Sequence, residues 1–288
     1  MLRRWGNERV AGLREPRVNP ACEPVGLPAD GRLRLLSFNI QVGNSTERFH
    51  HYLTRGWQHL LPHHERVSNL QRIGELLGDY DLVALQETDS GSLRTGYLNQ
   101  VEYLAQLGSF PYWYQQLNRN LGRLAQHGNG VLSRLQPNLL EDHPLPGPPG
   151  RGAILLRFGE GEDALAVVMM HLALGARTRT RQLAYIRELI GGYRHHVLMG
   201  DMNTHANELL ENSPLRDLGL IAPQTKATFP SWRPQRCLDH ILLSPQLSLE
   251  RVSVLPLSIS DHLPVAVEIR LPNFRTGTMP PMLCEEAH

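Results

Sequence analysis

The stretch HHVLMGDMNTHANELL, residues 195–210, decides how this chain folds. An apolar, strand-like segment runs into Gly200 and then into Asp201 and Asn203, so a buried strand ends on a carboxylate and a carboxamide. Asp and Asn are common where strands end, because their side chains hydrogen-bond to nearby backbone groups. One such ending is therefore weak evidence for a site. The same ending recurs along the chain, and the recurrence predicts both an architecture and a chemistry.

Other apolar segments begin or end in the same way. Three end on a polar side chain, as in LLSFN, LVALQE and AVVMMH, and two follow one, as in DHILL and SDHLPVAV. The end of one strand and the start of its antiparallel neighbour share an edge of the sheet, so one rim could collect all these residues. Singly, each is more often a turn residue than a catalyst; together they predict metal binding and acid–base chemistry. In chain order the candidates are Asn39, Glu87, His171, Asp201, Asn203, Asp239, Asp261 and His262.

Helix-like and strand-like segments alternate between these positions. Apolar residues at helical spacing predict helices over 64–78, 98–108 and 180–192, with a short, broken helical segment over 208–219. The expected buried faces are Val67, Leu70, Ile73 and Leu77 in the first helix and Val101, Leu104 and Leu107 in the second. The segments that read as strands are 32–40, 80–87, 128–134, 152–159, 164–174, 195–201, 238–244, 249–257 and 263–271.

This order of elements predicts an α/β fold with stacked mixed sheets flanked by helices. Residues 1–31, rich in Arg, Pro and Gly, are predicted to be an N-terminal arm, and residues 273–288 a C-terminal tail. Residues 32–272 then form one domain, because a chain of 288 residues can bury a large core as a single unit.

Charge and cysteine content narrow the classes of function. A formal net charge of +1 produces no strong positive electrostatic field that would favour binding along a long nucleic-acid duplex, although it does not exclude nucleic acid as a ligand. Cys22, Cys237 and Cys284 have neither disulfide nor zinc spacing, which suits a reducing compartment. No apolar run approaches the length of a membrane span, and the N-terminus lacks the apolar core of a signal peptide. We therefore expect a cytoplasmic protein without an integral membrane segment, and a monomer.

The motifs SFNI, LQET, MHLAL, GDMN, LDHI and SDHLP, in this order, resemble the endonuclease/exonuclease/phosphatase superfamily. The superfamily has a deoxyribonuclease I-like fold and includes abasic-site endonucleases, neutral sphingomyelinases and inositol-polyphosphate 5-phosphatases. The resemblance spans residues 33–271, with GDMN and SDHLP its most specific motifs, and HGNGVLSR is similar to a strand of bacterial members. It implies a four-layer α/β sandwich, two packed mixed sheets flanked by helices, and Mg²⁺-dependent hydrolysis of phosphoesters.

The resemblance also implies a role for each candidate residue. The implied metal ligands are Glu87 first, with Asn39 beside it and Asp261 assisting. Oxygen ligands of this kind suit Mg²⁺, and Mn²⁺ could replace it. The implied catalytic residues are Asp201, which orients or deprotonates the attacking water; Asn203 and His171, which hold phosphate oxygens; and the pair Asp239–His262, which favours an imidazolium.

The substrate stays open at this stage. Gln41 stands where abasic endonucleases carry an Asp, which weakens the case for abasic-site chemistry and for a second metal. Tyr52 or Trp57 could stack on a base, and Arg119 and Arg123 could meet phosphate, although each could equally be an ordinary packing or surface residue.

Three functions follow from this pattern. A nuclease, that is, an endonuclease or exonuclease, is the leading prediction. A phosphodiesterase or phosphatase for lipids or small molecules is the alternative. A catalytically silent binding protein ranks last, because no candidate residue is missing.

Overall fold

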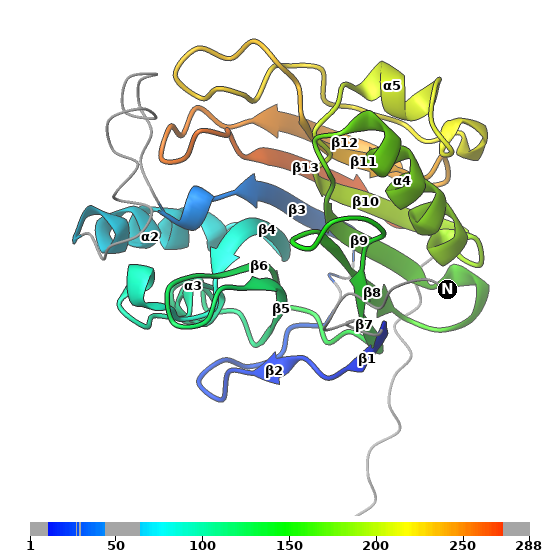
Figure 1. Cartoon of the computed structure of the whole chain (residues 1–288). Helices are drawn as coiled ribbons and strands as arrows, with labels where there is room; N and C mark the ends of the chain where they lie inside the picture. The colour runs from blue at the N-terminus through cyan, green and yellow to red at the C-terminus, as the bar shows by residue number, and fades with distance from the viewer. Residues whose placement is uncertain (1–10, 27, 29, 44–63, 273–288) are drawn as a thin grey trace, which may run out of the picture.

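A computed structural model describes residues 11–26, 28, 30–43 and 64–272 of the chain (Figure 1). Two β-sheets face each other in the middle of the molecule, and helices cover their outer faces. This is the four-layer α/β sandwich that the sequence predicts. No helix within the described residues is long and apolar enough to cross a membrane.

The six-stranded sheet has the strand order β1-β7-β8-β9-β10-β11. Its strands are β1 (Gly12–Arg14), β7 (Leu139–Pro144), β8 (Gly152–Phe158), β9 (Leu165–His171), β10 (His195–Asp201) and β11 (Asp239–Leu243). Neighbouring strands are antiparallel except β9 and β10, which are parallel and are joined by helix α4 (Ala176–Ile190). A crossover helix of this kind is the usual connection between parallel neighbours.

The seven-stranded sheet has the strand order β12-β13-β3-β4-β6-β5-β2. Its strands are β2 (Arg17–Val18), β3 (Arg32–Asn39), β4 (Leu82–Asp89), β5 (Tyr112–Asn120), β6 (Gln126–Ser133), β12 (Ser248–Val254) and β13 (Val265–Arg270). Only β3 and β4 are parallel, and helix α2 (His64–Leu77) lies between them in the chain. The remaining helical elements are α3 (Gln100–Leu107), α5 (Ala206–Leu210) and the short turns η1 (Gln41–Gly43), η3 (Leu93–Thr95), η4 (Gly161–Asp163) and η5 (Arg216–Leu218).

Alternate residues of a strand point to opposite sides of its sheet, so each central strand contributes side chains to two hydrophobic cores, one on either face. In β3, Leu33 and Leu35 join the core between the sheets, whereas Leu36 and Phe38 join the core on the side of α2 and α3. The six-stranded sheet likewise packs its outer face against α4 and α5. Strands that are apolar on both faces read as continuous apolar runs, which is why the sequence predicts them well.

The predicted faces of two helices need correction. Leu70, Ile73 and Leu77 of α2 are buried, but Val67 is 44% exposed; in α3, Leu107 is 42% exposed. A residue in an α-helix is rotated by about 100° from its predecessor, so residues spaced strictly by three drift off the buried face. Leu107 instead lies against α2 at Gly74, where an added Cβ would collide with its side chain.

The sequence does not predict strands β1, β2 and β7. Strands β1 and β2 lie within the predicted N-terminal arm and pair with β7 and β5 at the edges of the two sheets. In β7 the apolar pattern is broken by the buried Asp142, whose carboxylate accepts hydrogen bonds from Tyr114 and Gln116. A buried polar residue satisfied by distant partners leaves no periodic signal. The predicted C-terminal tail, 273–288, lies outside the described residues.

Candidate active site at one end of the sandwich

In several strands, the residues that face the opposite sheet are apolar except at one end of the strand, where the residue on that face is polar. In β9, Met169 belongs to the core between the sheets, and His171 continues its face two residues later. In β10, Asp201 follows Met199 in the same way. Alternation therefore directs these side chains into the space between the sheets, at one end of the sandwich. The buried residues that begin or end such series are Asn39, His171, Asp201 and Asp239.

The strand register brings three of these residues into one row. Asp201 lies opposite Asp239 in the antiparallel pair β10–β11 and beside His171 in the parallel pair β9–β10. Gly200 allows this close approach: its φ is +144°, and a Cβ there would collide with the carbonyl of Met170. A glycine before the aspartate is therefore a requirement of the backbone.

The carboxylate of Asp201 is the centre of the site. Its Oδ2 lies 3.2 Å from Nδ2 of Asn39, 3.4 Å from Nε2 of His171 and 3.9 Å from Nε2 of His262. Its Oδ1 accepts a hydrogen bond of 3.0 Å from the backbone N–H of Asn203. Burial opposes the charge, but His262, His171 and this hydrogen bond hold the pKa of Asp201 well below its usual range.

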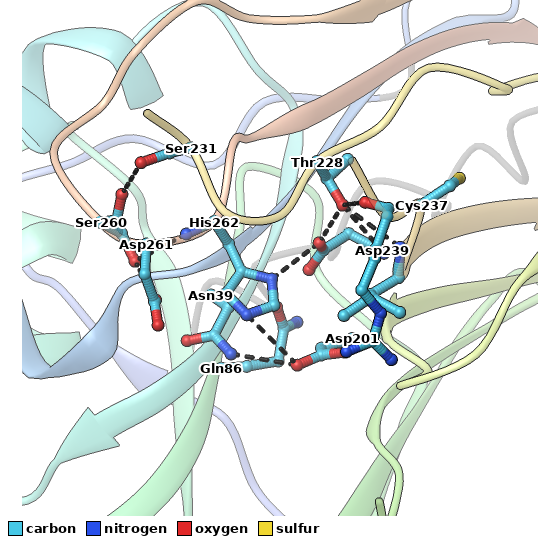
Figure 2. Close-up of polar contacts among 12 residues, drawn as sticks. Asn39, Gln86, Asp201, Thr228, Ser231, Cys237, Asp239, Ser260, Asp261 and His262 are labelled. Atoms are coloured by element: carbon cyan, nitrogen blue, oxygen red, sulfur yellow. Dashed lines mark hydrogen bonds and ion pairs between the residues drawn. The ribbon is translucent and has the colours of Figure 1, made fainter. Parts of the chain in front are cut away.

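His262 is held between Asp239 and Asp201, and in Figure 2 dashed lines join its ring to both. Its Nδ1 is 2.8 Å from Oδ2 of Asp239, which also accepts a 2.6 Å hydrogen bond from Oγ1 of Thr228. The ring of Phe229 lies against it at 4.9 Å between centroids. Burial lowers the pKa of His262, but the carboxylates of Asp239 and Asp201 outweigh it and raise the pKa well above its ordinary value. The geometry therefore favours an imidazolium.

Arg151, which immediately precedes β8, orients the second imidazole of the site. Its Nη1 lies 3.4 Å from Nδ1 of His171. A guanidinium can only donate, so Nδ1 of a neutral ring is the acceptor and Nε2 carries the proton that faces Asp201. The sequence contains no pattern that marks Arg151, because it follows a Pro- and Gly-rich loop rather than an apolar strand.

Glu87 reaches the site through an irregularity in β4. In this strand Leu82 and Ala84 face the other sheet, so regular alternation would turn Gln86 inward and Glu87 outward. The pairing of β4 with β6 shifts its register between Leu85 and Thr88, and Glu87 has a φ of +55°. A β-bulge of this kind re-aims a side chain. The carboxylate of Glu87 thereby meets the Nδ2 of Asn39 at 3.3 Å, and the same Nδ2 lies 3.2 Å from Asp201.

Asp261 completes the acidic side of the site. Ser260 donates a hydrogen bond of 3.2 Å to its Oδ1, and the loop is tied down by Ser231, which bonds to the backbone of both residues. Burial raises the pKa of Asp261 to about 7, and repulsion from Glu87 and Asp201 adds to this although His262 opposes it. Carboxylates crowded in this way repel one another unless a cation lies among them.

Asn203 also has an unusual backbone, with a φ of +51°. Its side-chain Nδ2 donates a 2.9 Å hydrogen bond to the carbonyl of Leu172, which follows β9. Non-glycine residues in the left-handed region cluster at functional sites, where the surroundings enforce them. With Asn203 and Asp261, the structure brings all eight candidate residues together at this end of the sandwich.

The donor atoms of the site fit a metal ion. Among the described residues, Asp201, Asp239 and His262 offer ligand atoms that all lie within 4.8 Å of one another. Oδ1 of Asp239 is buried and has no hydrogen-bond partner within the described part of the chain. Asp201, Asp239 and His262 are therefore a candidate site for a divalent cation, and Glu87 lies near it through Asn39, which contacts both Glu87 and Asp201.

A cleft of about 570 Å³ opens beside these residues. Glu87 and His171 belong to both the site and the cleft, whose walls include Arg119 of β5, Arg151, and His127 and Asn129 of β6. Arg123, at the tip of the β5–β6 hairpin, does not line it. Sequence reasoning assigns no role to His127 and Asn129, although both lie in the motif HGNGVLSR, and it misses Thr228, which lies in no distinctive pattern. Tyr52 and Trp57 lie outside the described residues.

Comparison with known proteins agrees with this fold. The model of the Endonuclease/Exonuclease/phosphatase family matches residues 36–262. The endonuclease/exonuclease/phosphatase from Beutenbergia cavernae has a similar structure, with a TM-score of 0.64, 19% sequence identity, and coverage of 83% of this chain and 72% of that one. A mannosyl-6-phosphatase from Bacteroides thetaiotaomicron gives 0.59 at 18% identity, covering 82% and 99%. D. rerio TDP2 complexed with a single-strand DNA product gives 0.59 at 15%, covering 84% and 100%. No curated protein matches the sequence.

Proposed function

The chain belongs to the endonuclease/exonuclease/phosphatase family, and on this premise we propose that it is a Mg²⁺-dependent phosphodiesterase that cleaves nucleic acid. One observation carries the proposal: a buried carboxylate, Asp201, lies within 4 Å of both His171 and His262, beside a cleft that admits a ligand. Phosphoester hydrolysis needs a water directed in line with the leaving oxygen and positive groups around the phosphate. This arrangement supports both requirements.

Mg²⁺ would be held by the oxygen-rich side of the site, Glu87, Asp261 and Asn39, because Mg²⁺ prefers carboxylate and carbonyl oxygens. An imidazole ligand suits softer ions, and Nδ1 of His262 is already engaged by Asp239. When bound, the ion neutralises charge that develops on the phosphate and stabilises the leaving oxygen. The negative charge of Glu87 repels that of Asp261, and a cation between the two carboxylates would relieve this repulsion, which supports a Mg²⁺ site here.

The remaining residues act on the water and on the phosphate. Asp201 orients the attacking water; its lowered pKa makes it a weak proton acceptor, which favours orientation over proton removal. His262 stays an imidazolium beside Asp239 and faces the charge that develops on a phosphate oxygen. The family resemblance assigns His171 and Asn203 to the other phosphate oxygens. Because Nε2 of His171 faces Asp201 and Nδ2 of Asn203 bonds to the carbonyl of Leu172, each would share its donor with the substrate.

The cleft supports a substrate with several phosphates, such as nucleic acid, because Arg119 and Arg151 both line it. Guanidinium groups are well suited to phosphate oxygens. A lipid phosphoester is the second candidate, and one observation favours it. Leu174, on the wall of the cleft, is 74% exposed, and Leu124, at the tip of the neighbouring hairpin, is 58% exposed. Exposed leucines beside a site suit contact with a membrane surface.

A panel of substrates tests the proposal. Bis-p-nitrophenyl phosphate reports phosphodiester cleavage of any kind, and single-stranded DNA, duplex DNA, RNA, sphingomyelin and phosphoinositides report the substrate class. We expect Mg²⁺-dependent cleavage that EDTA abolishes and that is greatest for nucleic acid. Asp201→Asn should remove it, whereas Asp217→Asn, at an exposed carboxylate distant in sequence, should not. Greater turnover of a lipid would support the second candidate, and no turnover of any diester would refute the proposal.

The cellular location is a further part of this proposal. Cys22 and Cys237 are free thiols, which suits the cytoplasm. Finding the protein in an oxidised, secreted fraction would overturn this.

A further inference from the structure

The cleft beside Asp201 is more cationic than the chain as a whole. The sequence carries a formal net charge of +1 with its histidines neutral, yet two arginines line this one cleft against the single carboxylate of Glu87. Burial and the nearby charge of Arg94 lower the pKa of His127, so this histidine lines the cleft as a neutral ring. Gly175 and Thr178, at the N-terminal end of α4, also line it. The N-terminal end of a helix adds partial positive charge to the same wall.

Arg151 and Arg119 lie close to each other on the wall of the cleft, next to Gly150. The Nη1 of Arg151 lies 3.3 Å from the carbonyl of Gly150 and 3.4 Å from the ring of His171. The side chain of Arg119 lies against Gly150, since a Cβ built on this glycine would be 3.9 Å from both Cβ and Cδ of Arg119. Within the described ranges, no carboxylate oxygen comes within 4.0 Å of either guanidinium.

A second network fixes His127 on the same wall. Asp89 accepts hydrogen bonds from Ser92 and from Nε of Arg94, the latter at 2.6 Å. The buried guanidinium of Arg94 then lies 3.3 Å from Nε2 of His127. Arg94 is too buried to meet a ligand itself, so its effect on the cleft is to position His127.

We propose that Arg119 and Arg151, with His127 on the same wall, form a subsite for a second anionic group, one linkage away from the phosphoester that is cleaved. The position follows from the chain of contacts: His171 separates Arg151 from Asp201, so an anion at the arginines lies next to the reacting phosphate rather than on it. Guanidinium groups are well suited to phosphate, and neither Arg119 nor Arg151 has a carboxylate partner within the described residues. The proposal rests on the proposed function and narrows its substrate to phosphoesters that carry a neighbouring phosphate.

Two sources would supply this chemistry. The neighbouring phosphate is the next linkage of a nucleic-acid strand or a terminal phosphate in a nucleotide, or it belongs to a phosphorylated headgroup. The experiment therefore compares matched pairs of substrates. The nucleotide pairs are the dinucleotide TpT against pTpT and against TpTp. The headgroup pair is glycerophosphoinositol against glycerophosphoinositol 4-phosphate.

The expected result is a preference for the phosphorylated member of at least one pair, expressed mainly as a lower KM. Arg119→Met keeps most of the apolar stem and removes the charge. It should reduce the ratio of kcat/KM between the two members by roughly tenfold, the loss expected for one charge-assisted hydrogen bond. Arg123→Met is the matched control, because Arg123 belongs to the same hairpin but does not line the cleft. Equal turnover of both members of every pair would overturn the proposal.

A binding measurement separates this subsite from the proposed activity. Inorganic pyrophosphate has two linked phosphates, so in EDTA it should bind the wild-type protein more tightly than inorganic phosphate by calorimetric titration. Arg119→Met should remove this advantage and Arg123→Met should keep it. Equal affinity for the two anions, or an advantage that survives in Arg119→Met, would refute the subsite. If bis-p-nitrophenyl phosphate is not cleaved while pyrophosphate binds as expected, the proposed function fails and the subsite stands.

Discussion

Asp201 and Asp239 lie directly opposite each other in the antiparallel pair β10–β11, and one imidazole contacts both. The ring of His262 places Nδ1 2.8 Å from Asp239 and Nε2 3.9 Å from Asp201. Two carboxylates buried this close would repel each other if nothing lay between them. The charge of His262 is therefore tied to both aspartates, which makes it sensitive to a change in either.

The first prediction concerns the pH dependence of activity. The raised pKa of His262 keeps the ring charged as pH rises, so activity that needs the imidazolium is present below this pKa and lost above it. Asp239→Asn removes the carboxylate that raises the pKa most. The alkaline limb of the kcat/KM profile should then move to lower pH, and kcat/KM near pH 8 should fall by roughly 10²-fold or more, as for the loss of a general acid–base group.

A stability measurement on the same variant provides the control. A group whose pKa is raised on folding contributes stability that is complete below the unfolded value, about 6.5, and is lost as pH rises through the folded value. The difference in unfolding free energy between the wild type and Asp239→Asn should therefore shrink as pH rises. An alkaline limb that stays at the same pH in a folded variant would contradict the assignment of His262.

The second prediction locates the metal. Glu87→Gln keeps the size of the side chain and its place in the bulge but removes one charge, so Mg²⁺ affinity should fall by about tenfold or more while the fold persists. Calorimetric titration of Mg²⁺ measures this. Glu141→Gln, in strand β7, is the matched control. If Mg²⁺ binds Glu87→Gln as well as wild type but fails to bind His262→Gln, the ion lies among Asp201, Asp239 and His262 instead.

Most of this site can be predicted from the sequence, because the alternation of side chains along each strand determines which of them face the site. His171 and Asp201 lie two residues beyond Met169 and Met199, which face the core between the sheets. Because side chains alternate along a strand, His171 and Asp201 are expected on the same inner face. The order of the strands brings their ends together. Register then adds what the sequence does not contain, namely that Asp201 faces Asp239 and that His171 is its parallel neighbour.

Glu87 marks the limit of such reasoning. Regular alternation along β4 would point the side chain of Glu87 away from the site. Only the bulge between Leu85 and Thr88 brings it into the site. A bulge depends on pairing with a distant strand and has no local signal here. The same holds for Arg151 and Thr228, which reach the site from irregular loops, and for Asp142, whose burial depends on Tyr114. The polar ending of LVALQE makes Glu87 a candidate, and the resemblance to a family gives it the role of metal ligand; strand alternation alone would turn it away from the site.

The third prediction tests the strained backbone at Asn203, where φ is +51°. Ala and Gly both remove the side chain, but only Gly adopts a positive φ without steric cost. Asn203→Ala should therefore be less stable than Asn203→Gly by about 1 kcal/mol, measured by urea unfolding. Both should lose activity to the same extent if the amide contacts the phosphate. Equal stability of the two variants would mean that the backbone here relaxes freely.

The fourth prediction concerns the network beneath the cleft. Burial raises the pKa of Tyr114 to about 12, helped by Asp142, whose carboxylate accepts its hydrogen bond at 2.9 Å. Tyr114→Phe should cost about 1–2 kcal/mol of unfolding free energy near pH 8. The unfolded chain releases the phenol proton near pH 10 but the folded chain holds it, so wild-type stability is lost as pH rises from there towards 12. The difference between wild type and Tyr114→Phe should shrink over this range and stay constant at neutral pH.

The last prediction tests whether Asp201 and Asp239 act as one unit. Asp239→Asn weakens the charge on His262, and Asp201→Asn removes the group that orients the water, so each should cost most of the activity by a separate route. Groups that serve one chemical step give non-additive losses, because once the step fails a second defect has little left to remove. The double variant should therefore be little worse than either single one. The measurement is kcat/KM for the wild type, both single variants and the double variant on bis-p-nitrophenyl phosphate, with circular dichroism to show that each is folded. Losses that multiply would mean that the aspartates act independently. Single losses below about tenfold, roughly 1.4 kcal/mol of barrier, would mean that catalysis takes place elsewhere.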